Sequence, residues 1–237
     1  MPDFSSRSYQ EELMDDLNAP TDELHLNLDE IIQINKITGG PAVSIQGVKR
    51  LLESTSKNEI HFVDIGCGGG DMLAYLAKQT PRSGVKFKLT GVDFQPKAID
   101  FAKKKYPWLA DRVNWIVADY KELLQSGFKA DVFHAALFCH HFTDEELVSF
   151  FSSLKEASEL GFIINDLHRH PLAYYGVKAI NTVASKSRFT KHDAPLSVLR
   201  AFKKSELQDL LSQAGVERYS MTWKWAFRYL VVGEVNL

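Results

Sequence analysis

Acidic side chains stand at regular distances in the first half of the chain, and the first of them precedes a glycine cluster. Asp64 is followed by IGCGGGD, and two further acids, Asp93 and Asp119, each end an apolar run. Glycines clustered after a strand are typical of a turn with positive φ or of a ligand that lies against the main chain. Because all three acids fall at strand ends, the pattern predicts one ligand pocket with three carboxylates at its rim.

The glycine loop distinguishes two classes of ligand. A nicotinamide dinucleotide site requires G-x-G-x-x-G or A, because a pyrophosphate docks on the N-terminus of the following helix. From Gly66 this loop is GCGGGD, with Asp71 in the sixth place. A carboxylate there would repel a pyrophosphate and favours a ligand that carries positive charge. A nicotinamide-dependent oxidoreductase is therefore disfavoured and is kept as an alternative.

Histidines supply the candidate acid–base groups. His140 and His141 follow the fourth predicted strand, and His168 and His170 follow the fifth. Histidine titrates near neutral pH, so it can remove a proton from a hydroxyl group. We expect His168 to be this base, ahead of His141, because it stands two residues past Asp166 at the end of a strand.

An alternation of strand and helix patterns must position these groups. Strands are predicted at residues 60–65, 87–93, 113–119, 130–138 and 162–167, with helices at 72–79, 95–107, 120–126 and 143–161. Thr143 and Glu146 have the spacing of a capping box, and Gly161 is predicted to lie just past the helix end. Two strand-like runs in residues 216–235 predict a hairpin. The expected fold is α/β: a seven-stranded, mostly parallel sheet with an antiparallel C-terminal hairpin strand and helices on both faces.

The remaining segments predict two additions to this sheet. Residues 1–57 have helical patterns and are expected to form an N-terminal helical cap, which leaves residues 58–237 as the ligand-binding domain. About 37 residues, 167–203, separate the fifth strand from the helix at 205–215, which is long for a crossover and typical of a lid. Tyr174 and Tyr175 in this lid would contact an aromatic substrate or form the lid's own core.

Composition excludes several classes of function. The net charge of −2 gives no basic excess, so nucleic acid is not an expected partner. No apolar run reaches the length of a membrane span, and the N-terminus is too polar for a signal peptide, so we expect a cytoplasmic protein. The two cysteines, Cys67 and Cys139, lie in no CxxC motif, and neither a disulfide framework nor a metal site is predicted.

The motifs resemble those of a known family. VDIGCGGGD, together with Asp93 and Asp119, is similar to the cofactor motifs of class I S-adenosylmethionine-dependent methyltransferases. LFCHHFTDEEL resembles a segment of their small-molecule and ubiquinone/menaquinone-type branches, and the likeness covers residues 60–166. The resemblance implies a Rossmann-like fold, S-adenosyl-L-methionine as cofactor and S-adenosyl-L-homocysteine as product.

The resemblance also implies roles for single residues. The cofactor-binding residues would be Asp64, Gly66, Cys67, Gly68, Gly70, Asp71, Asp93, Phe94, Asp119, Tyr120 and Phe138. The carbonyl of Gly66 would accept from the methionine ammonium, and Asp93 would accept from both ribose hydroxyls. Phe94 would pack on the adenine, Asp119 would accept from its amino group, and the Tyr120 amide would donate to its ring.

Three features bear on the acceptor. The N/D-P-P-Y motif of many DNA-base and glutamine methyltransferases is absent at the end of the fourth strand, which disfavours that class. The aromatic side chains of the lid and the apolar N-terminal helices favour a small aromatic or polyketide-like compound, and a histidine base favours a hydroxyl acceptor and O-methylation. His140, His170, Tyr174 and Tyr175 are the expected substrate-binding residues. C-methylation of a quinone precursor and a non-catalytic S-adenosylmethionine-binding module are the alternatives. The protein is expected to be a monomer or a homodimer.

Overall fold

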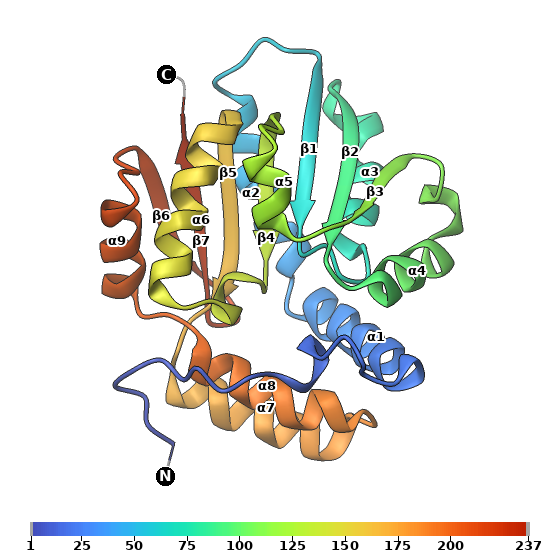
Figure 1. Cartoon of the computed structure of the whole chain (residues 1–237), viewed down its shortest axis with the longest axis vertical. Helices are drawn as coiled ribbons and strands as arrows, with labels where there is room; N and C mark the ends of the chain where they lie inside the picture. The colour runs from blue at the N-terminus through green and yellow to red at the C-terminus, as the bar shows by residue number, and fades with distance from the viewer. Residues whose placement is uncertain (1, 236–237) are drawn as a thin grey trace.

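A seven-stranded sheet with the order β3-β2-β1-β4-β5-β7-β6 runs through the computed structural model, which describes residues 2–235 and, of residues 80–83, the backbone alone (Figure 1). The strands are β1 (Glu59–Ile65), β2 (Lys86–Asp93), β3 (Val113–Val117), β4 (Ala130–Ala136), β5 (Ser158–Leu167), β6 (Tyr219–Lys224) and β7 (Arg228–Glu234). The first five strands are parallel, whereas β7 is antiparallel to both of its neighbours, β5 and β6. The predicted fold class, including the antiparallel hairpin, is confirmed.

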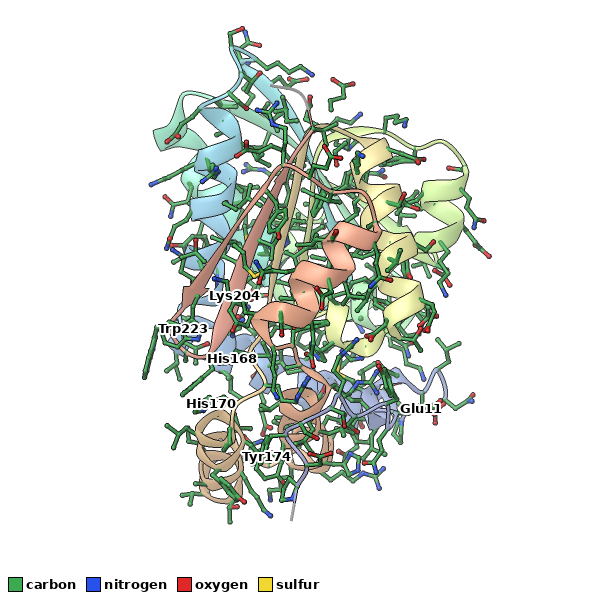
Figure 2. The ribbon with its side chains drawn as sticks, turned by 90° about the vertical axis from the view of Figure 1, so that its left-hand side faces the viewer. Glu11, His168, His170, Tyr174, Lys204 and Trp223 are labelled. Carbon is green, nitrogen blue, oxygen red and sulfur yellow. The ribbon has the colours of Figure 1, made fainter. Side chains whose placement is uncertain are left out.

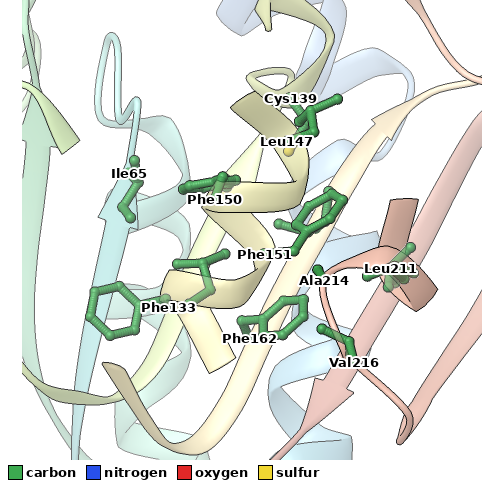
Figure 3. Close-up of a cluster of buried hydrophobic side chains, with 14 of the residues drawn as sticks. Ile65, Phe133, Cys139, Leu147, Phe150, Phe151, Phe162, Leu211, Ala214 and Val216 are labelled. Atoms are coloured by element: carbon green, nitrogen blue, oxygen red, sulfur yellow. The ribbon is translucent and has the colours of Figure 1, made fainter. Parts of the chain in front are cut away.

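Helices cover both faces of the sheet. One face carries α2 (Gly40–Leu52), α3 (Asp71–Ser83) and α4 (Pro96–Lys105), and the other carries α5 (Tyr120–Gln125), α6 (Asp144–Ala157) and α9 (Lys204–Gln213). Figure 3 shows the core under α6, where the rings of Phe151 and Phe162 stack with centroids 6.3 Å apart. Because both faces are covered, the central strands are buried on both sides and their sequences are nearly continuous apolar runs.

The boundary between α6 and β5 differs from the prediction. The capping box of Thr143 and Glu146 is present at the start of α6, but the helix ends at Ala157 and β5 begins at Ser158. Gly161 is therefore not a helix stop. A Cβ atom at this position would lie 2.0 Å from the carbonyl oxygen of Gly233, so the glycine permits the close approach of β5 and β7.

A separate layer lies across the carboxyl ends of the parallel strands. It contains the N-terminal segment with the short helix η1 (Leu13–Asp15), α1 (Thr21–Ile37), α7 (Pro171–Ala184) and α8 (Arg188–Arg200) (Figure 1). The predicted lid, residues 167–203, thus consists mainly of two helices. Only the first part of residues 1–57 lies in this layer, because α2 packs against β5 and β7. No helix within residues 2–235 has the length and apolar character needed to span a membrane.

A buried arginine joins this layer to the sheet domain. Arg169 is 2% exposed, donates to the carbonyl oxygens of Ala201 and Phe4, and forms a bidentate ion pair with Glu206 of α9. Removing one partner of such a pair leaves buried polar groups without a partner.

We expect Arg169→Met to lower the free energy of unfolding by about 3 kcal/mol or more, because the buried acceptors of its guanidinium lose their donor. Urea denaturation of the full chain measures this change. Arg50→Met is the matched control, since Arg50 pairs with Glu234 while its side chain is 50% exposed, and it should cost less than about 1 kcal/mol. Equal losses for the two variants would show that Arg169 contributes no more to the free energy of unfolding than a surface ion pair does.

Candidate functional site

Two adjoining cavities lie between the strand ends and the layer of α1, α7 and α8. The first, the Asp93 chamber, has a volume of about 300 Å³ and is lined by Asp93, Phe94, Asp119, Tyr120, Phe138 and Phe142, among others. The second, the Glu12 chamber, has a volume of about 190 Å³ and is lined by Glu12, Asp64, Asp71, His140, Arg228 and many apolar side chains. Both chambers are lined by Met14, Leu28, Gly66, Gly68, Leu137 and His141. These shared residues form a common wall.

The glycine loop between β1 and α3 forms part of that wall. Gly66 has a φ of +66°, and a Cβ atom there would lie 2.2 Å from the ring of Phe138. The loop can pass the ring only because this residue has no side chain. Gly70 has another function: it precedes α3, its N–H donates to the carbonyl oxygen of Cys67, and it lines neither chamber. Cys67 lines the Glu12 chamber, and burial raises the pKa of its thiol well above the usual value.

Asp93 is a buried acceptor of its chamber whose two carboxylate oxygens are held by backbone donors. It lies at the end of β2, is 8% exposed, and receives hydrogen bonds from the backbone N–H groups of Gly68 (2.8 Å) and Gln95 (2.9 Å), one at each carboxylate oxygen. A carboxylate has about four acceptor positions, so each oxygen keeps capacity for a ligand. Burial raises the pKa of Asp93 to about 6, against the lowering effect of the two N–H donors.

Aromatic rings form the opposite side of the Asp93 chamber. Tyr120 packs edge-to-face with Phe138 and Phe142, with centroid distances of 5.7 and 5.1 Å, while Phe94 is 43% exposed. Asp119 is exposed at the N-terminus of α5 and accepts from the N–H of Lys121. The chamber is therefore lined by three carboxylates, those of Asp15, Asp93 and Asp119, and by several ring faces, which a ligand with hydroxyl groups and a flat ring system requires.

The two other predicted acids lie in the Glu12 chamber and have protein partners. Asp64 accepts a 2.6 Å hydrogen bond from Nδ1 of the buried His134, and Asp71 accepts a 2.7 Å hydrogen bond from Asn35. Burial raises the pKa of Asp71. These carboxylates give the chamber negative potential beside the glycine loop.

Arg228, which sequence reasoning missed, faces the same chamber. It lies on β7, is 2% exposed, and donates from Nη2 to the Thr38 hydroxyl at 3.1 Å. Its Nε and Nη1 atoms have no hydrogen-bond partner among the described residues. Burial lowers the pKa of Arg228 to about 10, against the raising effect of Asp166 and Asp71. A buried guanidinium with free donors is costly unless an acceptor pairs with it, which indicates a site for an anionic group.

His140 and His141 meet a glutamate that the sequence did not single out. Nδ1 of His140 lies 2.7 Å from Asp166, and Nδ1 of His141 lies 2.9 Å from Asp15. The Nε2 atoms of the two rings face the carboxylate of Glu12 at 3.6 and 3.9 Å. We call these three residues the Glu12 cluster.

The charge of His141 follows from these neighbours. Burial alone would lower the pKa of His141, but the Glu12 carboxylate and the hydrogen bond to Asp15 raise it to about 9. Burial would likewise raise the pKa of Asp166, but its pairing with His140 lowers it to about 2. His141 is therefore protonated at neutral pH in the ligand-free protein, and it can donate a hydrogen bond into the common wall.

The structure does not bring His168 and His170 to either chamber. The N–H of His168 donates to the carbonyl oxygen of Phe227, and its Nδ1 accepts from Trp223 at 3.3 Å. His170 accepts from the N–H of Leu172 at the start of α7, and its ring stacks on Phe227. Figure 2 shows both histidines on the side of Trp223. The chain keeps pairing with the C-terminal hairpin after β5 ends, and this directs His168 away from the glycine loop.

The two lid tyrosines also lie outside the chambers. Tyr174 packs edge-to-face on Phe4 with a centroid distance of 5.6 Å, and Tyr175 is 51% exposed. The predicted lid, residues 167–203, lines the Glu12 chamber through other residues, namely Leu167, Val177, Thr190, Asp193, Ala194, Ser197 and Val198. Of the predicted site residues, those from Asp64 to His141 other than Gly70 line a chamber, and those in the lid do not.

Comparison with known proteins agrees with this arrangement. Residues 62–161 match a family model described as a methyltransferase domain. No curated protein matches the chain.

Solved structures show the fold. The plantazolicin methyltransferase BpumL in complex with S-adenosylhomocysteine has a TM-score of 0.68 at 17% identity, over 95% of this chain and 99% of that one. Magnesium protoporphyrin IX methyltransferase (ChlM) from Synechocystis PCC 6803 with bound S-adenosylmethionine has a TM-score of 0.55 at 17% identity, over 86% and 84%. The plantazolicin methyltransferase BamL has a TM-score of 0.61 at 19% identity, over 82% and 70%.

Proposed function

We propose that this chain is a class I S-adenosylmethionine-dependent methyltransferase. It transfers the methyl group of S-adenosylmethionine to a hydroxyl of a small aromatic or polyketide-like compound. The observation that supports this most is the common wall. It joins a chamber with carboxylates and ring faces to an apolar chamber with a buried histidine cluster, so that a donor and an acceptor can meet at Gly66, Gly68 and His141.

The Asp93 chamber suits the nucleoside of the cofactor. Asp93 would accept from the two ribose hydroxyls with the acceptor positions that its backbone donors leave free. Phe94 and the rings around Phe138 would pack on the adenine, and Asp119 would accept from its amino group. S-adenosylmethionine carries no phosphate group, so the carboxylates at this end of the sheet would not repel it.

The Glu12 chamber suits the methionine part beside the glycine loop. The carbonyl of Gly66 and the carboxylate of Asp71 would attract the ammonium, and the free Nε and Nη1 donors of Arg228 would bind the carboxylate. Asn35 holds Asp71 in place. The sulfonium, which is also a cation, would then lie at the common wall, near the carboxylates.

The acceptor would occupy the apolar remainder of the Glu12 chamber, with its hydroxyl at the Glu12 cluster. Methyl transfer from a sulfonium is an in-line displacement with an activated donor, so the protein contributes mainly alignment and exclusion of water. Protonated His141 would stabilise the developing oxyanion. Glu12, whose carboxylate lies 3.9 Å from His141 Nε2, would take the proton as the bond to the methyl group forms.

Transfer of a labelled methyl group tests this function. Purified protein is incubated with S-adenosylmethionine carrying a deuterated methyl group and a panel of phenols and hydroxylated polyketide-like compounds, and the products are fragmented by mass spectrometry. We expect a labelled methoxy group and formation of S-adenosylhomocysteine. A label on carbon would favour the C-methyltransferase alternative. Cofactor binding with no product from any member of the panel would favour a non-catalytic binding module.

The binding of S-adenosylhomocysteine should weaken in acid. Only ionised Asp93 is a full acceptor for the ribose hydroxyls, and its pKa is about 6 in the ligand-free protein. Between pH 7.5 and pH 5 the dissociation constant should therefore rise about tenfold. Calorimetric titration at several pH values measures it. Asp93→Asn should bind weakly at every pH, with a much flatter profile; an equally steep profile in this variant would assign the pH dependence to another group.

A further inference from the structure

We propose that Glu12, His140 and His141 form a binding site for one divalent transition-metal ion, such as Zn²⁺, in the wall of the Glu12 chamber. One ligand atom from each residue lies within 4.8 Å of the other two. This inference goes beyond methyl transfer, because binding of the ion requires no methyl donor. The sequence predicted no metal site, since its cysteines lack metal-binding spacing and Glu12 is far along the chain from the two histidines.

The hydrogen bonds behind the two rings direct them as in metal sites. A histidine that binds a metal through one ring nitrogen usually donates from the other to a carboxylate or carbonyl. Here both Nδ1 atoms have carboxylate partners, Asp166 for His140 and Asp15 for His141. Both Nε2 atoms are therefore left as the free ligand positions, and both face Glu12.

Asp166 behind His140 and the ligand carboxylate of Glu12 are held by further hydrogen bonds. Asp166 accepts from the backbone N–H groups of Cys139 and Leu167, each at 2.7 Å, and Glu12 accepts from the Ser197 hydroxyl at 2.8 Å. His140 is 2% exposed, Glu12 is 4% exposed, and His141 is half-buried. Their side chains are therefore confined before any ion binds. Confinement of this kind lowers the entropy cost of binding.

The distances fit a single ion. The 3.6 Å between Glu12 Oε1 and His140 Nε2 and the 3.9 Å between Glu12 Oε2 and His141 Nε2 are too long for hydrogen bonds. Ligands at roughly 2.0–2.2 Å from one tetrahedral ion lie about 3.3–3.6 Å apart. The three ligand atoms lie within 4.8 Å of one another, so they would have to move together by at most about 1.5 Å on binding. Two imidazoles and one carboxylate favour zinc or a similar transition metal over Mg²⁺ or Ca²⁺, which prefer oxygen ligands.

The charges around the cluster favour a cation. Three carboxylates, those of Glu12, Asp15 and Asp166, surround the two imidazoles. Two arginines oppose this charge: Arg200, whose Nε lies 3.8 Å from Glu12 and donates to the carbonyl oxygen of His140, and the buried Arg7, which donates to the same carbonyl oxygen at 3.4 Å.

The site is open on two sides. A surface groove of about 860 Å³, lined by Glu12, Asp15 and His141, offers an entry path from solvent. On the other side, the three ligand residues Glu12, His140 and His141 line the Glu12 chamber, so an open coordination position would face the proposed acceptor. A hydroxyl bound there would lose its proton to solvent more readily, as water does on a catalytic zinc ion, and Glu12 as a ligand of the ion would no longer serve as the base.

Cobalt and zinc titrations of the full chain test the site without an activity assay. After treatment with a chelator, the wild type is expected to bind one Co²⁺ with visible absorption bands, and Zn²⁺ should displace it. Glu12→Gln and His140→Gln should weaken binding at least a hundredfold, and Asp15→Asn, which removes only a supporting carboxylate, about 10- to 100-fold. His192→Gln, whose imidazole is exposed and lies outside the cluster, should bind as the wild type does.

Circular dichroism and thermal unfolding show which variants are folded, and Asp15→Asn tests the site even if a ligand variant is not. The proposal is overturned if Glu12→Gln or folded Asp15→Asn binds Co²⁺ as tightly as the wild type, or if His192→Gln removes the binding. It is also overturned if the wild type binds S-adenosylhomocysteine but no ion, and in that case the proposed function is unaffected. A chain that binds an ion but no S-adenosylhomocysteine would contradict the proposed function alone.

Discussion

The Asp93→Ala variant is expected to bind S-adenosylhomocysteine about 30- to 700-fold more weakly than the wild type. The variant loses a charged acceptor for two ribose hydroxyls. One charged hydrogen bond contributes roughly 1.5–3 kcal/mol, and two that share one carboxylate are not additive, so the loss should be about 2–4 kcal/mol. Because the carboxylate also accepts from Gly68, part of the loss comes from a less ordered glycine loop. Calorimetric titration of the two proteins at pH 7.5 measures the difference.

Asp100→Ala is the control for this variant. Asp100 is an exposed acid on α4, and it lines neither chamber. Its removal changes the net charge by the same amount and should leave the dissociation constant within about twofold. If Asp93→Ala binds as tightly as Asp100→Ala, the ribose is not held at the end of β2, and the nucleoside must bind elsewhere.

The His141→Gln variant is expected to lose about 10²–10³-fold in turnover with far less change in the affinity for S-adenosylhomocysteine. Glutamine keeps a hydrogen-bond donor but cannot supply the positive charge that would stabilise the oxyanion, and such groups typically contribute this factor. Steady-state kinetics with whichever acceptor the labelled-methyl assay identifies measures kcat, and calorimetry measures cofactor affinity.

The His168→Gln variant shows whether His141 or His168, the base expected from the sequence, is the histidine that contributes to turnover. His168 lies against Trp223 and Phe227, outside both chambers, so its replacement should leave turnover within about threefold of the wild type. A hundredfold loss in His168→Gln, with His141→Gln nearly unaffected, would restore His168 as the base and would require the lid to rearrange during the reaction.

The sheet and the Asp93 chamber could be predicted because their signals are local. Each strand ends in a recognisable residue, and parallel strands necessarily bring their carboxyl ends to one edge, so Asp64, Asp93 and Asp119 could be placed at one edge of the sheet without a structure. The single pocket predicted for them is instead two adjoining chambers, with Asp93 and Asp119 in one and Asp64 in the other. The glycine loop was similarly informative, since Gly66 has the positive φ that its position after β1 suggested.

The Glu12 chamber could be predicted only in part. Asp64, Asp71, His140 and His141 were named from the sequence, but two of its other polar residues come from distant segments. Glu12 lies before the first helix and Arg228 in the last strand, and neither is part of a motif. Only the packing of the N-terminal segment against α8 and the pairing of β7 with β5 bring them to the strand ends. His168 was misplaced for a related reason: its partner Phe227 belongs to the hairpin, and no local pattern indicates that pairing.

The two chambers together would bind S-adenosylmethionine, and parallel calorimetric titrations with S-adenosylhomocysteine and NADH distinguish this cofactor from a nicotinamide dinucleotide. We expect a micromolar, one-to-one complex with S-adenosylhomocysteine and no measurable heat from NADH, because Asp71 at the start of α3 would repel a pyrophosphate. Micromolar binding of NADH with no heat from S-adenosylhomocysteine would contradict it.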